Sequence, residues 1–249
     1  MKIFIIFKKR WVILTMIAIA AAAVLIRLGF WQLDRLQQRR EFNARVLSQI
    51  NQPVLTLNAQ TMALDLMSME YRTVTVSGQY DHQKQVTLIN QAYRNQFGVH
   101  LLTPLRIAGT DAYILVDRGW APAEGDAPGS WAAYDEAGIV EVTGVIRKAQ
   151  PSRSLLALPT PTLLPGETIQ RSWLFADIDQ ISAAIGLELL PVYVQQAPTP
   201  SWTGLPYRTE PDLDLTEGSH QSYALQWFTF ALIVIIGYPV YVFREEQKR

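Results

Sequence analysis

Two long apolar runs at the ends of the chain limit what it can fold into more than any other feature. The first covers residues 11–31, with Trp11 and Trp31 at its ends and Arg27 as its single charge. The two tryptophans are separated by ~30 Å of helix, which is one hydrocarbon thickness of a bilayer. The second run, residues 223–243, carries no charge. Both runs predict transmembrane helices.

A cleaved signal peptide is the alternative explanation for the first run. Basic residues 8–10 precede it, and the alanines of residues 20–23 offer small side chains for cleavage. These alanines lie in the middle of the run, however, and helix-favouring sequence continues from Gln32 to Arg40. We therefore expect an uncleaved anchor.

The basic residues around the second run predict the orientation. Arg244, Lys248 and Arg249 follow it, whereas Arg208 is the sole basic residue in the ~15–20 positions before it. The first run does not decide, because basic residues flank it on both sides. We expect a protein that crosses a membrane twice, with its domain in the periplasm or on the equivalent side in an organelle, and of the two we favour a bacterial inner (plasma) membrane. Its cytoplasmic ends would be residues 1–10 and 244–249, and residues 32–222 would form a periplasmic domain.

Charge and cysteine content exclude several classes of function. The stretch 28–222 holds 14 Lys and Arg against 20 Asp and Glu, so the central domain would repel the phosphates of nucleic acid. The chain has no cysteine, which excludes disulfides, thiolate metal sites and cysteine nucleophiles.

The central domain has the pattern of a β-rich α+β fold. A helix is predicted for residues 32–49 as a continuation of the first span, and another for 177–185, with Asp177 as its N-cap and Gly186 at its end. Residues 150–168 are expected to form an extended loop. The pattern fits a sandwich or a partly closed barrel and does not fix the topology. Strands are predicted for residues 71–80, 85–89, 100–107, 113–116, 139–147 and 189–196.

Common catalytic motifs for nucleotide binding, serine hydrolysis and zinc proteolysis are absent. Asp117 and Arg118 fit an ion pair at the end of a strand better than an active-site turn. The three histidines would form a metal site only if all of them converged. Met62, Met67 and Met69 form a cluster that fits the filling of apolar gaps better than a Cu(I) site.

His220 stands out because it lies three residues before the second span, at the expected depth of the lipid headgroups. An imidazole there is either an ordinary interfacial side chain or an axial ligand to haem. The residue chemistry by itself leaves both readings open.

An ordered series of motifs resembles the Surfeit-locus (surfeit-one) family of cytochrome c oxidase assembly proteins. The resemblance covers nearly the whole chain, including both spans. Its motifs lie at Leu28–Leu36, Tyr71–Asp81, Leu102–Leu105, Leu115–Pro122, Gly144–Arg147, Trp173 with Asp177, Pro191–Tyr193 and His220–Phe228.

The resemblance implies a non-enzymatic chaperone of the respiratory chain that handles haem a. Its partners would be the catalytic subunit of a haem-copper oxidase, other assembly factors and the lipid bilayer. The resemblance implies a cofactor at His220, as ligand of the haem iron, with Tyr223, Gln226 and Trp227 beside it. The family often has asparagines just before this histidine, where this chain has Gly218 and Ser219.

Two other functions stay open. One is a structural accessory that holds oxidase subunits without a cofactor, and the other is a copper carrier that uses the methionine cluster. If the two spans pack as a pair, the motifs at 28–36 and 220–228 are predicted to form a single patch at the outer interface.

Overall fold

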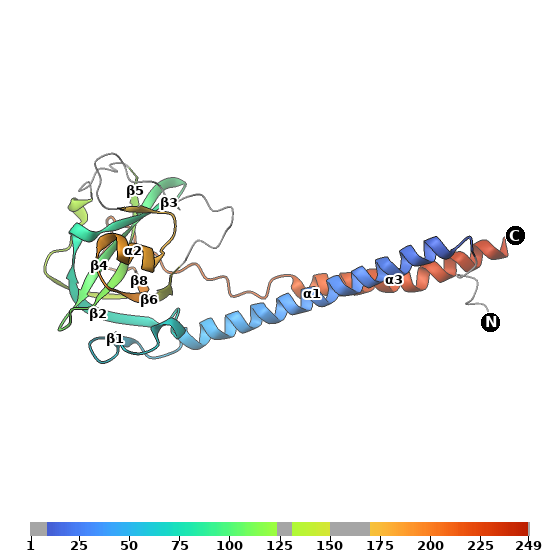
Figure 1. The fold of residues 1–249 in the computed structure, drawn as a ribbon, viewed down its shortest axis with the longest axis horizontal. Coiled ribbons are helices and arrows are strands. Elements are labelled where there is room, and N and C mark those ends of the chain that lie inside the picture. Colours follow the sequence, from blue (N-terminus) through green and yellow to red (C-terminus); the bar gives the residue numbers. More distant parts are fainter. Residues whose placement is uncertain (1–8, 124–130, 150–169, 249) are drawn as a thin grey trace. The chain divides into compact units, whose positions relative to one another are not determined.

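The computed structural model describes residues 9–123, 131–149 and 170–248 (Figure 1). The chain divides into two units, which we call the helix pair (up to residue 45 and from 214 onward) and the β domain (46–213). The elements are α1 (Val12–Ile50), β1 (Leu55–Leu57), η2 (Leu66–Ser68), β2 (Thr73–Tyr80), η3 (His82–Lys84), β3 (Val86–Tyr93), β4 (Gln96–Ile107), β5 (Tyr113–Pro122), η4 (Ala132–Tyr134), β6 (Ile139–Lys148), β7 (Ser172–Trp173), α2 (Ile178–Ile185), β8 (Leu189–Gln196) and α3 (His220–Gln247).

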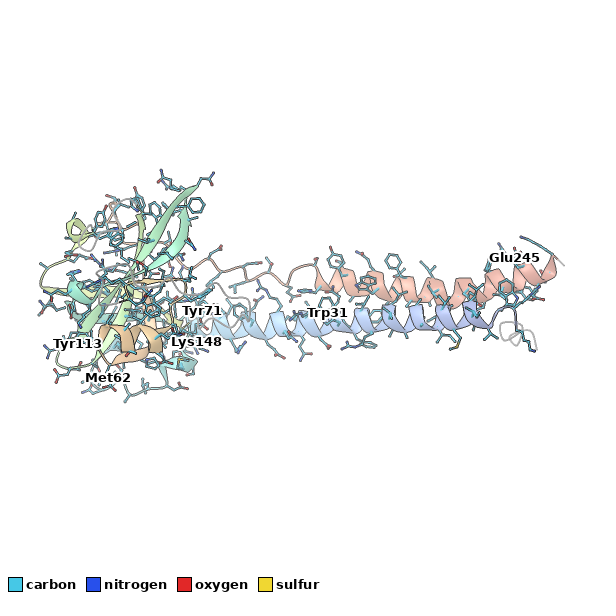
Figure 2. The ribbon with its side chains drawn as sticks, turned by 45° about the horizontal axis from the view of Figure 1, so that its top comes forward. Trp31, Met62, Tyr71, Tyr113, Lys148 and Glu245 are labelled. Atoms are coloured by element: carbon cyan, nitrogen blue, oxygen red, sulfur yellow. The ribbon has the colours of Figure 1, made fainter. Side chains whose placement is uncertain are left out.

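The helix pair consists of α1 and α3, which lie side by side (Figure 1). The first span and the helix predicted after it form one continuous helix of 39 residues. The α3 helix continues through Pro239 to Gln247. Both helices are long and apolar enough to cross a membrane. Their side chains project outward along much of their length (Figure 2), and Ile13 is 74% exposed. Such exposure suits a helix surrounded by lipid rather than water.

The β domain is a closed barrel, which resolves the choice between a sandwich and a barrel. The strand order is β1-β2-β6-β8-β5-β4-β3-β7, and β2 also pairs with β4, so β2, β6, β8, β5 and β4 form a ring. The closing pairs join Gly78 to Ile107 and Tyr80 to Leu105. A Cβ on residue 78 would lie 2.2 Å from the carbonyl oxygen of Arg106, so glycine permits the two strands to meet.

Alternation along the strands builds two layers of core. In β5, Ile114 and Val116 belong to the cluster inside the barrel, while Leu115 belongs to a second cluster that includes the buried residues of α2. Neighbouring residues of a strand point to opposite faces, so one strand supplies both layers. The α2 helix is confirmed with both predicted ends: Asp177 accepts a hydrogen bond from the backbone of Gln180, and Gly186 is left-handed with φ 66°.

The remaining strand predictions are mostly confirmed, with differences in length. The β5 strand extends to Pro122, well beyond the predicted residue 116. The β3 and β4 strands meet in a two-residue hairpin whose Arg94 and Asn95 both have positive φ, the geometry of a type I′ turn. Strands β1 and β7 are too short to leave a sequence pattern. The loop expected at 150–168 falls outside the described residues.

Candidate functional site

A hydrogen bond between the two helices forms the centre of the candidate site. His220 is the first residue of α3, and its Nδ1 lies 2.8 Å from Oε1 of Gln32 on α1. Both side chains are half-buried. The two residues are 188 positions apart in the sequence. The structure therefore brings together the two motifs that we expected to share a patch.

A close approach of the helices lies next to this bond. A Cβ on Gly29 would lie 2.5 Å from the ring of Phe228, so glycine at position 29 lets the aromatic ring pack directly against α1. The ring of Phe228 also meets Phe30 edge-on, with 5.4 Å between centroids. This packing fixes the helices relative to each other one turn from Gln32.

Polar contacts hold the segment that enters α3. Arg40 donates to both carboxylate oxygens of Glu217 at 2.8 Å, and this partner lowers the pKa of the Glu217 carboxyl. Asn43 donates to the carbonyl of Leu215 at 2.6 Å, and Arg39 donates to that of Thr216 at 2.9 Å. These contacts place the chain just before His220 and so position its side chain.

The other predicted site residues lie along the same helix but differ in their surroundings. Tyr223 follows His220 by three residues and Trp227 follows Tyr223 by four, which places all three on one side of α3. Tyr223 is 48% exposed, whereas Trp227 is half-buried and its Nε1 has no hydrogen-bond partner among the described residues. Gln226 is exposed and lies further round the helix. Gln32 was missed, although the resemblance covers it, because no sequence signal pairs it with His220.

The residues at this end of the helix pair fit a large, flat, apolar ligand with a coordinating metal. Among the residues that the structure describes, the imidazole of His220 has a hydrogen-bond partner at one nitrogen, Nδ1. Phe30 and Trp31, the latter labelled in Figure 2, are 53% and 43% exposed on α1. A porphyrin requires an axial nitrogen and apolar surface, and both are present here.

A second group of polar residues lies inside the β domain, on β5. Asp117 pairs with His100, with 2.8 Å between Oδ2 and Nδ1, and accepts a hydrogen bond from the backbone of Gly119. Arg118 is fully buried and pairs with Glu136 at 3.1 Å. The expectation of an ion pair at a strand end was therefore wrong in two respects: each residue has a different partner, and both lie within the strand. Adjacent residues on a strand face opposite sides, so Asp117 and Arg118 cannot pair with each other.

Glu136 joins two buried arginines into a network. Its Oε1 accepts from Arg118 at 3.1 Å and from Arg208 at 2.9 Å. Arg118 also donates to the carbonyl of Tyr134 and lies 5.0 Å from the ring centroid of Tyr80. Burial raises the pKa of Tyr80, which favours its neutral hydroxyl. The Arg118 side chain is fully buried and that of Glu136 is 22% exposed, so most of the network is shielded from water, which suits a structural role.

Gly119 and Trp120 complete the β5 motif. Gly119 has φ 117°, and a Cβ there would lie 2.4 Å from the carbonyl oxygen of Tyr207. A glycine is therefore required here by the backbone geometry and the close approach of the two segments. Trp120 is 2% exposed and stacks on Tyr207, which places its side chain in the core of the β domain.

Within the described ranges, no three His, Asp or Glu side chains are grouped to hold a metal. His82 and His100 contact the Glu136 carbonyl and Asp117, respectively. Met62 and Met69 pack against the barrel core, and Met67 is 40% exposed. Filling of gaps therefore accounts for two of the three methionines.

Comparison with known proteins identifies the family. The model of the SURF1 family matches residues 19–232. The SURF1-like protein of Caenorhabditis briggsae is 24% identical over 92% of this chain and 75% of its own length. That of Rickettsia prowazekii (strain Madrid E) is 29% identical over 88% of this chain and 85% of its own length. Surfeit locus protein 1 of Mus musculus is 22% identical over 81% and 66%, respectively. These matches confirm the resemblance seen in the motifs, and the chain belongs to the SURF1 family.

Proposed function

We propose that this protein assists the assembly of a haem-copper terminal oxidase by holding haem a on its way to the catalytic subunit. The role is non-enzymatic, since the haem is cargo. The observation that carries the proposal is the His220–Gln32 pair, which presents an oriented imidazole at one end of two helices fit to cross a membrane. Membership of the SURF1 family supports the same role.

In this proposal His220 supplies the axial nitrogen to the iron. Tyr223 and Trp227 provide aromatic surface on the same side of α3, and Gln226 supplies a polar group at its edge. Haem a has a long apolar tail that prefers lipid and propionates that prefer the aqueous interface. The expected depth of His220, three residues before the predicted second span, suits both parts of the ligand.

The proposed orientation follows from the charges around the second span. Arg244, Lys248 and Arg249 at the C-terminus favour the cytoplasmic side, so residues 32–222 would face the periplasm of a bacterial inner membrane. The partners would be the oxidase catalytic subunit and other assembly factors. Contact with them would be made at the periplasmic interface and within the bilayer.

The visible spectrum of the purified protein tests the ligand. The full chain is co-expressed with the enzymes of haem a synthesis and purified in detergent, and haem per protein is measured by absorbance. Wild type should carry haem, and His220→Ala should lose most of it. The matched control is His82→Ala, a half-buried histidine of the β domain, which should retain wild-type haem content. Equal haem in His220→Ala and wild type would refute the assignment.

A second candidate is a structural accessory that holds oxidase subunits without a cofactor. It is favoured by an apolar groove of about 380 Å³ between α1 and α3, lined by small residues that include Ala18, Ala22 and Ala23. Small residues allow another transmembrane helix to approach closely. This candidate predicts co-purification with oxidase subunits even when haem a synthesis is blocked, which the haem-carrier proposal does not.

A further inference from the structure

We infer that Gln32 is the positioning residue of this site and that it selects Nε2 of His220 as the ligating nitrogen. The selection of a nitrogen rests on the structure of the helix pair alone. Its consequence for haem rests on the function proposed above.

The argument starts from the atoms in the hydrogen bond. Nδ1 of His220 lies 2.8 Å from Oε1 of Gln32, which is an amide oxygen and can only accept. A neutral imidazole carries one N–H, so that hydrogen must sit on Nδ1 when this bond forms. The lone pair that can bind a metal then belongs to Nε2.

Contacts on both sides of the Gln32–His220 hydrogen bond hold the two side chains in place, so the bond does not have to align the helices by itself. Within one turn of α1, the contact of Gly29 with Phe228 sets the distance between the helices. On the other side, Arg40 holds Glu217 and Asn43 holds the Leu215 carbonyl. Ordering by these contacts means that little further entropy is lost when the two side chains meet.

Neither Ser219 nor Gly218, the two residues directly before His220, orients its imidazole. Ser219 is the N-cap of α3, but its side chain makes no capping hydrogen bond. A Cβ on Gly218 would lie 3.6 Å from Cδ2 and 3.8 Å from Nε2 of His220, so glycine leaves that edge of the ring uncovered. Glycine at position 218 thus leaves room beside Nε2, while α1 engages Nδ1.

A hydrogen bond to the second nitrogen of a metal-bound histidine fixes its ring and tunes its basicity. An amide acceptor such as Gln32 raises the basicity of the imidazole moderately. A carboxylate at position 32 should raise it further, so that the imidazole donates more electron density to the iron and favours the oxidised state. An apolar side chain should lower the basicity and favour the reduced state.

The first experiment needs no haem. The full chain is labelled with ¹⁵N-histidine in detergent, and the tautomers are determined by NMR at alkaline pH, where imidazoles are neutral. His220 should carry its hydrogen on Nδ1. Gln32→Leu should abolish this preference, whereas the matched control Gln38→Leu, an exposed glutamine of α1, should keep it. The signals of His82 and His100 should not change. A wild-type His220 with its hydrogen on Nε2, or one indifferent to Gln32→Leu, would overturn the inference.

The second experiment uses the haem-loaded protein and measures the midpoint reduction potential. Gln32→Glu should shift it to more negative values and Gln32→Leu to more positive ones, with Gln38→Glu unchanged from wild type. If haem binds through His220 and neither substitution at position 32 moves the potential, the positioning role fails and the proposed function stands. If the wild-type tautomer is as inferred but no haem binds, the proposed function fails and the tautomer assignment stands.

Discussion

The helix pair and the β domain differ in where their apolar side chains lie: on the surface in the helix pair and in the core in the β domain. In the β domain, Val74 is fully buried in a barrel closed by backbone hydrogen bonds. In the helix pair, Ile13 is 74% exposed, and the helices meet through a few defined side chains. Lipid solvates apolar side chains as well as a protein core does, so burial supplies little drive for the helices to associate. Specific contacts such as Gln32 with His220 therefore decide how the helices align.

Charged residues show the same contrast. Arg118 in the β domain is fully buried, and removal of its partner would leave an uncompensated charge inside the protein. Arg40 and Glu217 in the helix pair remain about half exposed as side chains. Their ion pair positions a segment but adds little free energy. The buried charges of the β domain therefore act on stability, whereas this exposed ion pair of the helix pair acts on the position of a segment.

The largest expected effect comes from Glu136→Gln in the β domain. The substitution removes the negative partner shared by Arg118 and Arg208 and should destabilise the domain by about 3–5 kcal/mol. The measurement is the free energy of unfolding of the full chain in urea. The control is Asp111→Asn, which breaks an ion pair with Arg106 at the surface and should cost less than ~1 kcal/mol. Equal losses in the two variants would contradict the distinction between buried and exposed charge.

An intermediate effect is expected from Gly29→Val in the helix pair. The added side chain collides with the ring of Phe228, and overpacking of this kind costs about 1–3 kcal/mol. Displacement of the helices should remove the Nδ1–H preference of His220 in the ¹⁵N spectrum and leave the urea midpoint of the β domain unchanged. Ala20→Val, at an exposed position of α1, should alter neither signal. A normal His220 signal in Gly29→Val would show that the close approach does not set the site.

The smallest effect is a pH dependence that comes from His100. Burial alone lowers the pKa of His100, but the charge of Asp117 and the hydrogen bond to it raise the pKa by more, so the net direction is upward. A raised pKa stabilises the fold fully below the ordinary value of about 6.5, and this contribution is lost as pH rises through the folded-state pKa. Wild type should thus lose some unfolding free energy as pH rises above about 6.5.

His100→Gln removes the titrating group and should flatten that dependence. His82→Gln is the matched control and should keep the wild-type slope. The measurement is urea unfolding at a series of pH values. Identical slopes in wild type and His100→Gln would exclude this pair as the source.

The predictable part of the fold follows from local pattern. The predictions for strand β8 and helix α2 were correct, because alternation and capping are patterns of residues that are close in the sequence. Barrel closure was not predictable, since it depends on β2 meeting β4 through Gly78, a contact between distant segments. The pairs Asp117–His100 and Arg118–Glu136 could not be predicted either, because each joins residues that are distant in the sequence.

For the candidate site, the sequence alone determined that two segments are long and apolar enough to span a membrane and that His220 lies beside the second one. Length, hydropathy and flanking charge are properties of short stretches of sequence, and they decide whether and in which orientation a helix inserts into a bilayer. Only the tertiary structure decided that Gln32 meets His220, because a hydrogen bond between helices depends on their rotation and distance, which Gly29 and Phe228 set. The residues around Gln32 in the sequence therefore do not indicate that its partner is His220, 188 positions away.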